Sequence, residues 1–239
     1  MRVLINHITR MRRGRICVAG LDFATDRHVR PILQTDLLHK HLTCEGGLFE
    51  TGAVIDLGSV KPKPYGPHIE DVEFRWRSAR RLPDVPPEEF WRRLTAVAKP
   101  TLRELFGPDL LPRGKQHAGV DEGRGQCSLG CLLVQQPPRL VIEPRDGKPR
   151  IRMWLRSKHH EFDLGVTDIR LYGDDHVTPS EEAVRRAAEK LARARYDQGE
   201  VILSVGLTRA SADWFTDQIA LHWLQVNNLH FADEPYWRT

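Results

Sequence analysis

Cysteines are scarce in this sequence and lie far apart. Four occur in 239 residues, at positions 17, 44, 127 and 131. A secreted domain held by disulfides needs a denser set, so we expect free thiols and a reducing compartment, the cytosol. Long apolar runs are missing as well, since none approaches the roughly 18–20 residues that cross a membrane. The opening stretch, Met1–His7, turns polar too early for a signal peptide.

Catalytic signatures are also missing. The sequence has no phosphate-binding glycine loop, no nucleophile elbow and no HExxH helix. His159, His160 and Glu161 are adjacent, and adjacent residues on a strand face opposite sides, so they cannot converge on one metal ion. We therefore expect a protein without enzymatic activity or cofactor, and a metal-dependent nuclease ranks third among the interpretations.

Two short pairs of histidine and cysteine leave a zinc site open as an alternative. His41 and Cys44 are separated by two residues, and Cys127 and Cys131 by three, so together they could supply four zinc ligands. Neither pair has the close spacing of a structural zinc knuckle. Buried or loop thiols are the simpler interpretation of the cysteines.

The composition is that of an ordinary folded protein, but its charge is uneven. Hydrophobic residues make up 40% and charged residues 28%, and the net charge is +4. Residues 1–40 hold eight basic and three acidic side chains, and residues 139–160 hold seven and two. Two arginine-rich blocks in an otherwise acidic chain predict a positive face suited to phosphate.

Short β-strands dominate both halves of the expected fold. Apolar, β-branched runs bounded by turn residues predict them, and Asp146-Gly147 predicts a hairpin turn between two of them. In the first half the expected strands are Arg2–Ile8, Arg15–Leu21, His28–Leu33, Ala53–Leu57 and Val72–Arg77, and in the second Leu132–Val134, Arg139–Glu143, Arg150–Arg156, Glu161–Leu164, Val201–Leu207 and Trp223–Leu229.

Two segments are predicted to be helical. Pro86-Pro87 opens the first, and Thr178-Pro179-Ser180-Glu181 matches a capping box for the second. Residues 107–126 are rich in glycine and polar residues without an apolar period, which predicts a long loop. The expected division is an N-terminal barrel at 1–82, a helical connector and loop at 83–126, and a C-terminal barrel at 127–239.

The predicted strand at 150–156 is the most informative segment. Alternation places Ile151, Met153 and Leu155 on one face, and the opposite face then offers cations around an indole ring. Such a face suits single-stranded nucleic acid, with cations along the phosphates and a ring on which a base stacks. The alternative is a solvated outer face whose tryptophan is covered by a loop or by the helix after position 178. The expected binding residues of this face are Arg150, Arg152, Trp154, Arg156 and Lys158.

A second cationic element lies near the N-terminus, where the turn at residues 10–15 could hold a phosphate backbone. A soluble hairpin tip is the alternative interpretation. The expected binding residues here are Arg10, Arg12, Arg13, Arg15, Arg27 and Arg30.

Polar residues also interrupt the predicted strands at 201–207 and 223–229. Their side chains either face a shared groove or bond to neighbouring loops.

Several strings of residues resemble the bacterial dual OB-fold family over nearly the full length. They are Thr9–Met11, Ile16–Asp22, Val29–Pro31, Val201–Arg209, His222–His230 and Pro235–Trp237. The resemblance implies two OB-like barrels and a nucleic-acid-binding role, sometimes in bacterial defence. It brings no catalytic residues with it.

The sequence therefore predicts a mainly β protein of the α+β class, with two small OB-like β-barrels joined by a helical connector. Its expected function is binding of single-stranded DNA or RNA without catalysis, because stacking on Trp154 requires unpaired bases. The alternative is a protein-interaction or adaptor module of a defence system, with other defence proteins as partners.

Overall fold

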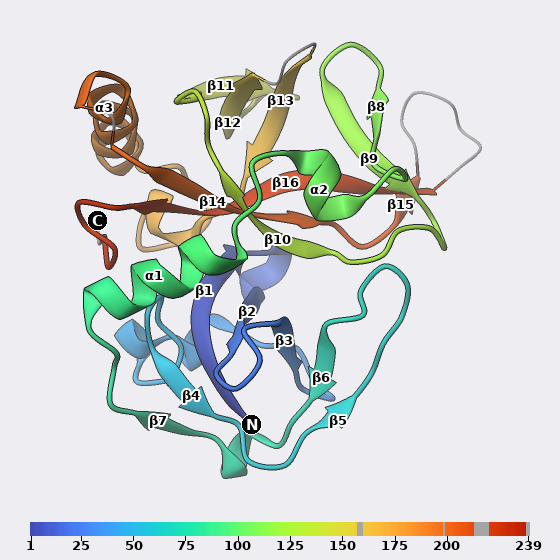
Figure 1. The fold of residues 1–239 in the computed structure, drawn as a ribbon, viewed down its shortest axis with the longest axis vertical. Coiled ribbons are helices and arrows are strands. Elements are labelled where there is room, and N and C mark those ends of the chain that lie inside the picture. The colour runs from blue at the N-terminus through green and yellow to red at the C-terminus, as the bar shows by residue number, and fades with distance from the viewer. Residues whose placement is uncertain (157–159, 198, 213–219, 238–239) are drawn as a thin grey trace.

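Two curled β-sheets and three α-helices make up the described part of the molecule (Figure 1). The computed structural model describes residues 1–156, 160–197, 199–212 and 220–237. The first sheet is built from the N-terminal strands and the second from the strands after position 110. The mainly β, α+β class expected from the sequence is confirmed.

Seven strands form the first sheet, in the order β5-β6-β3-β2-β1-β4-β7. Neighbours pair antiparallel, except that β3 and β6 run parallel. The sheet curls over an apolar core that includes Ile5, Phe49 and Ile55. Its strands are β1 (Arg2–Arg10), β2 (Ile16–Asp22), β3 (His28–Ile32), β4 (Val54–Asp56), β5 (Lys61–Pro62), β6 (Asp71–Glu73) and β7 (Arg80–Leu82).

β1 is buried along nearly its whole length because it has neighbours on both faces. Ile5 packs into the first core, whereas Leu4 belongs to a core shared with the second sheet. The register with β2 shifts between Ile5 and His7, which is a β-bulge. Bulges re-aim side chains, and here Asn6 and His7 lie buried in the contact zone between the two sheets, which we call the seam.

Nine strands form the second sheet, in the order β10-β14-β16-β13-β12-β11, and β8, β9 and β15 are attached through β16. β11 and β12 form the expected hairpin, with positive φ angles of 51° at Asp146 and 70° at Gly147, as its turn requires. The strands are β8 (Leu111–Arg113), β9 (His117–Asp121), β10 (Leu129–Leu133), β11 (Arg139–Arg145), β12 (Lys148–Arg156), β13 (Glu161–Val166), β14 (Val201–Leu207), β15 (Ser211–Ala212) and β16 (Ala220–Phe231).

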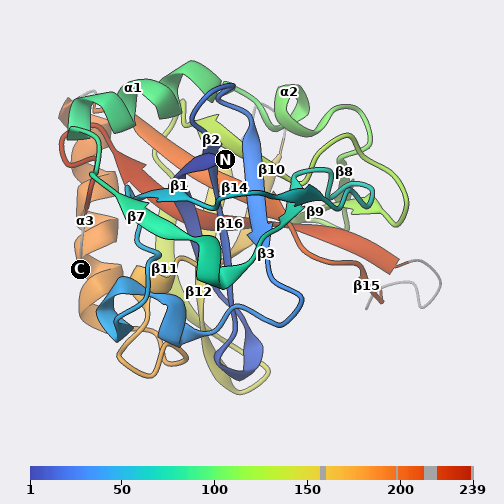
Figure 2. The same cartoon turned by 90° about the horizontal axis from the view of Figure 1, so that it is seen from below.

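Three α-helices cover the sheets. α1 (Pro87–Val97) begins at the paired prolines and buries Phe90 and Leu94 in the shared core. Figure 2 shows α1 and α2 (Leu102–Phe106) following each other along one edge of the molecule. No described helix is long and apolar enough to span a membrane. Short 3-10 helices lie at Arg12–Gly14, His39–His41, Thr43–Glu45, Trp76–Ser78 and Ile169–Leu171.

α3 (Glu181–Asp197) packs Ala187 and Leu191 into the core of the second sheet. Its cap lies two residues beyond the expected one. Ser180 Oγ accepts the N–H of Ala183 at 3.2 Å, while the Thr178 hydroxyl donates to Asp175. The serine occupies the cap because its oxygen reaches the third N–H of the helix.

The expectation of one long loop over residues 107–126 is wrong in part. β8 and β9 form a hairpin within it, and β9 pairs antiparallel with β16. Ala118 and Val120 of β9 are buried. Two apolar residues are too few to give a readable period, and the strand depends on its tertiary pairing with β16.

Candidate nucleic-acid interface

A groove of about 690 Å³ opens where the two sheets meet. Its walls come from β1, β2 and β3 on one side and from β12, β14 and β16 on the other. Two hydrogen bonds join the sheets beside it. The N–H of Arg10 donates to the carbonyl of Thr167 at 2.9 Å, and the N–H of Ile8 donates to Asn228 Oδ1 at 2.6 Å. Both sheets are therefore needed to form the groove.

Arginines from distant parts of the chain converge on this groove. Four belong to residues 1–40 and one to residues 139–160, so the two basic blocks of the sequence meet here. A sixth follows β14. The lining arginines are Arg10, Arg12, Arg15, Arg30, Arg150 and Arg209.

The turn between β1 and β2 presents Arg12 and Arg13 to solvent. Arg13 has a φ of 62° and Gly14 a φ of 68°, so the chain reverses through left-handed backbone. Neither arginine forms an ion pair with any residue that the structure describes. Arg12 lines the groove wall and Arg13 lies on the same turn, so both are available to phosphate.

Arg10 and Arg15 of the same turn are held in place. Arg10 Nε donates to the carbonyl of His176 at 3.0 Å, and its guanidinium carbon lies 4.7 Å from the centre of the Tyr172 ring. Neither contact neutralises its charge. Arg15 pairs with Asp36 at 3.4 Å, so part of its charge is compensated.

Beneath the groove, Arg30 is paired with a buried carboxylate. Arg30 is 6% exposed, and its Nε donates to Asp71 Oδ1 at 2.6 Å. The other oxygen of Asp71 accepts from Arg209 Nη2 at 2.6 Å, and the Arg209 side chain is 52% exposed. A buried charge requires such pairing. Glu70 is a second buried carboxylate beside Arg30, and both side chains bond to Ser128. The two guanidiniums are therefore balanced by two carboxylates, although Arg209 still offers its exposed donors to the groove.

Two amide side chains of β16 also line the groove. Gln225 Nε2 donates to Asn227 Oδ1 at 2.9 Å, and Asn227 Nδ2 lies 3.1 Å from His7 Nδ1. Gly206 on β14 leaves the space for this pair, since a Cβ there would lie 2.5 Å from Asn227 Nδ2. Amides both donate and accept, which suits the edge of a base.

Three groove residues were not among the predicted binding residues, namely Arg209, Gln225 and Asn227. The sequence feature that could have identified these three residues was the run of polar residues within strands of strong β-forming residues. Other polar members of these strands, such as Ser204 and Asn228, are buried and bond to β1 of the opposite sheet, which neither interpretation foresaw.

β12 has the two faces that alternation predicts. Side chains at 151, 153 and 155 are buried, and those at 150, 152, 154 and 156 are half-buried or exposed. Among the described residues of that outer face, Arg150 alone lines the groove. Arg152 Nε donates to the buried Asp163 at 2.7 Å, and Arg156 lies 3.5 Å from Glu161. Lys158 lies outside the described residues.

Trp154 is half-buried on this outer face. Its Nε1 donates to Glu143 Oε1 at 3.2 Å, and the guanidinium carbon of Arg139 lies 5.4 Å from its ring centre. Four residues of extended strand, about 13 Å, separate it from Arg150. Trp154 therefore lies beyond the groove rather than in it. Arg27, exposed between β2 and β3, does not line the groove either.

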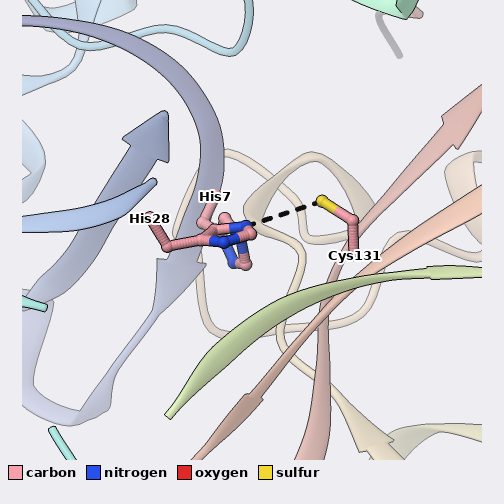
Figure 3. Close-up of side chains that lie close together, drawn as sticks. All are labelled: His7, His28 and Cys131. Carbon is pink, nitrogen blue, oxygen red and sulfur yellow. Dashed lines mark hydrogen bonds between the residues drawn. The ribbon is translucent and has the colours of Figure 1, made fainter. Parts of the chain in front are cut away.

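Uncharged titratable groups gather in the seam (Figure 3). Burial, followed by the nearby His28, lowers the pKa of His7 well below its usual value. Burial lowers the pKa of His28 to about 4 and raises the pKa of the Cys131 thiol to about 12. Burial and then Arg170 lower the pKa of the neighbouring His230 to about 3. These groups are neutral near pH 7, so the charge of the groove comes from its arginines.

The four residues weighed as zinc ligands do not come together. They are His41, Cys44, Cys127 and Cys131. Cys131 lies beside His7 and His28, and Cys44 lies near Glu45. Cys127 Sγ instead donates to the carbonyl of Leu105 at 3.2 Å. Spacing along the chain misleads here because the contacts of Cys131 are made across the seam.

A second hollow, of about 960 Å³, lies between α1 and residues 232–236. Its lining includes Glu88, Glu200, Asp233 and Glu234, with Arg92 as a basic member. Carboxylates repel a phosphate backbone. The arginine-lined groove is therefore the candidate nucleic-acid interface.

Comparisons with known proteins identify the family. A search of curated proteins found no match. One similar solved structure is a murine DNA-binding protein bound with double-stranded DNA, at 12% identity and a TM-score of 0.31, covering 97% of this chain and 96% of that chain. A TM-score this low supports no conclusion about fold or ligand. The family model described as Dual OB-containing domain matches residues 1–229, and the chain therefore belongs to this family.

Proposed function

We propose that this protein binds single-stranded DNA or RNA in the groove at the seam, without catalysing a reaction. The observation that carries the proposal is the convergence of six arginines from both sheets on one groove, with Asp36 as the acidic residue of its lining. Clustered guanidiniums bind a phosphate backbone by charge and by paired N–H donors. OB-folds commonly bind oligonucleotides, in agreement with the family of this chain.

The preference for unpaired bases rests on two features. Gln225 and Asn227 offer donors and acceptors at the groove, within reach of bases that are not already paired. Trp154 offers a half-buried ring about 13 Å from Arg150 along β12, on the same face. A strand that leaves the groove past Arg150 would reach this ring, so we propose Trp154 as a stacking platform for longer ligands.

The division of the chain into domains, its location and its biological setting are part of the same proposal. We propose two OB-like barrels, at 1–82 and 127–239, joined by the connector at 83–126. The connector carries α1 and α2, and its last part supplies β8 and β9 to the second sheet. The cytosol as location and bacterial defence as setting rest on the cysteine content and the family resemblance of the sequence.

Fluorescence anisotropy with labelled oligonucleotides tests the proposal. Single strands should bind more tightly than duplexes of equal length, and binding should weaken as salt rises. Arg150→Gln should weaken binding, whereas Arg186→Gln, on the exposed surface of α3 and outside the groove, should not. Absent or salt-insensitive binding would instead favour an adaptor role.

A nuclease assay tests the non-enzymatic part of the proposal. Labelled oligonucleotides are incubated with the protein and a divalent metal ion and then separated on a gel. Intact substrate is the expected result. Cleavage that copurifies with the protein would refute the absence of catalysis.

A further inference from the structure

Three potential metal ligands from both sheets meet in the seam (Figure 3). They are His7 of β1, His28 of β3 and Cys131 of β10, and each offers one nitrogen or sulfur atom. These atoms all lie within 4.8 Å of one another. Imidazole and thiolate together are the donor set that zinc prefers.

The spacing of two of these atoms already matches zinc coordination. Cys131 Sγ and His28 Nε2 are 3.6 Å apart. Zinc binds nitrogen at about 2.1 Å and sulfur at about 2.3 Å, and at a tetrahedral angle such ligands lie about 3.6 Å from each other. The third ligand needs to approach by roughly 1 Å at most, which a side-chain rotation can supply.

His7 is buried and has a ring nitrogen that makes no hydrogen bond within the described part of the chain. The residue is 1% exposed, and its Nε2 makes no hydrogen bond with any described residue. Its Nδ1 lies 3.1 Å from the amide of Asn227. A buried polar atom without a partner calls for an explanation, and a bound ion is one. In the arrangement described, the Asn227 amide nitrogen donates to His7 Nδ1. For His7 Nε2 to bind a metal ion, this amide turns so that its oxygen accepts the proton of Nδ1, which is how metal-bound histidines are typically held.

The surroundings of Cys131 also suit a metal-bound sulfur. Asn6 Nδ2 lies 3.4 Å from Cys131 Sγ and can donate to it, and the bulge in β1 is what places Asn6 there. Cys131 itself is fully buried. His28 is partly exposed and gives an ion a route from solvent.

We propose that His7, His28 and Cys131 form a zinc site that joins the first sheet to the second. The ion uses three protein ligands and leaves its fourth position to a solvent molecule, as zinc sites with three protein ligands do. Because the ligands come from both sheets, zinc stabilises the arrangement in which the groove exists. The site stands apart from the proposed nucleic-acid binding and does not depend on it.

Metal titration tests the site. The purified full chain, stripped of metal, is titrated with zinc by calorimetry and with cobalt by absorption. The wild type should bind one zinc ion per chain, and its cobalt form should show thiolate-to-cobalt charge transfer in the near ultraviolet. Cys131→Ala should abolish that band, and His28→Gln should weaken binding by more than the roughly 10–100-fold that loss of an outer hydrogen bond costs.

Two matched controls separate this site from other thiols. Cys127→Ser changes a half-buried cysteine on the same segment, and Cys44→Ser removes the exposed group near Glu45 and His176. Both variants should bind zinc as the wild type does. Zinc should also raise the melting temperature of the wild type and of both controls but not of His28→Gln, which is partly exposed and so expected to fold.

Several outcomes would overturn the site. They are a wild type that binds no zinc, a cobalt band that persists in Cys131→Ala, and loss of binding in Cys44→Ser instead of His28→Gln. If Cys131→Ala does not fold, the comparison of His28→Gln with the two controls decides. Oligonucleotide binding is measured separately, so failure of the zinc site leaves the proposed function untouched.

Discussion

The charge of the groove sets how steeply binding should depend on salt. Six arginines line it, and three carboxylates compensate them, Asp36 at Arg15, and Asp71 and Glu70 at Arg30 and Arg209. About three positive charges remain for phosphate. Each phosphate contact on a single strand contributes a slope of about −0.7 to a plot of log affinity against log salt, so the expected slope is about −2.1. Affinity should then fall about 20-fold between 50 and 200 mM salt.

Arg150→Gln removes one of these charges, and Arg150 has no ion pair with any described residue to rearrange. The slope should become about −1.4, which is about a 7-fold loss over the same salt range. Anisotropy titration of one labelled oligonucleotide at four salt concentrations measures it, with Arg186→Gln as the control. A slope equal to that of the wild type, or an equal change in Arg186→Gln, would refute the assignment of Arg150 to the phosphate path.

Three further predictions address the ring, the packing of the groove and the buried histidines. Trp154→Ala should weaken the binding of long oligonucleotides by about 1 kcal/mol, roughly 5-fold, and leave the binding of short ones unchanged, because the ring lies beyond the groove. A large fall in melting temperature with unchanged binding would show that the ring is structural. Gly206→Ala should lower the free energy of unfolding, measured in urea, by about 1–3 kcal/mol, because its Cβ would lie 2.5 Å from Asn227 Nδ2. An unchanged urea midpoint would refute this crowding. Stability should fall as pH drops from 6.5 to 5, because the unfolded chain takes up a proton that His230, with its pKa lowered to about 3, does not. His230 alone should account for a loss of about 2 kcal/mol, and His7 and His28, whose pKa values are also lowered, add to it. Urea unfolding of His230→Gln should therefore show a flatter pH dependence than the wild type.

Local patterns in the sequence predicted the local structure well. β14 spans Val201–Leu207 as expected, the hairpin turns at Asp146-Gly147, and the faces of β12 alternate as written in the sequence. These features depend on neighbours within a few residues, so periodicity and turn chemistry determine them. Four arginines of the first basic block and Arg150 of the second line one groove, and for the rest of the second block the single positive face stays a prediction.

Contacts between segments that are distant in the sequence could not be predicted from it. β9 exists because it pairs with β16 about a hundred residues later. Arg152 was expected to bind nucleic acid, whereas its guanidinium is paired with Asp163 on the next strand. Cys131 was paired with Cys127 by spacing, whereas its neighbours are His7 and His28 on another sheet. Such partners are far apart in the sequence, and each pairing depends on which strands lie side by side or pack together in the folded protein.

The central claim is that nucleic acid lies in the groove between the sheets. Photo-crosslinking of a bound single-stranded oligonucleotide, followed by mass spectrometry of the crosslinked peptides, tests it most directly. The account predicts crosslinks in the peptides that carry Arg10–Arg15, Arg150 and Gln225–Asn227. Crosslinks confined to other surfaces, such as the acidic hollow beside α1, would contradict it.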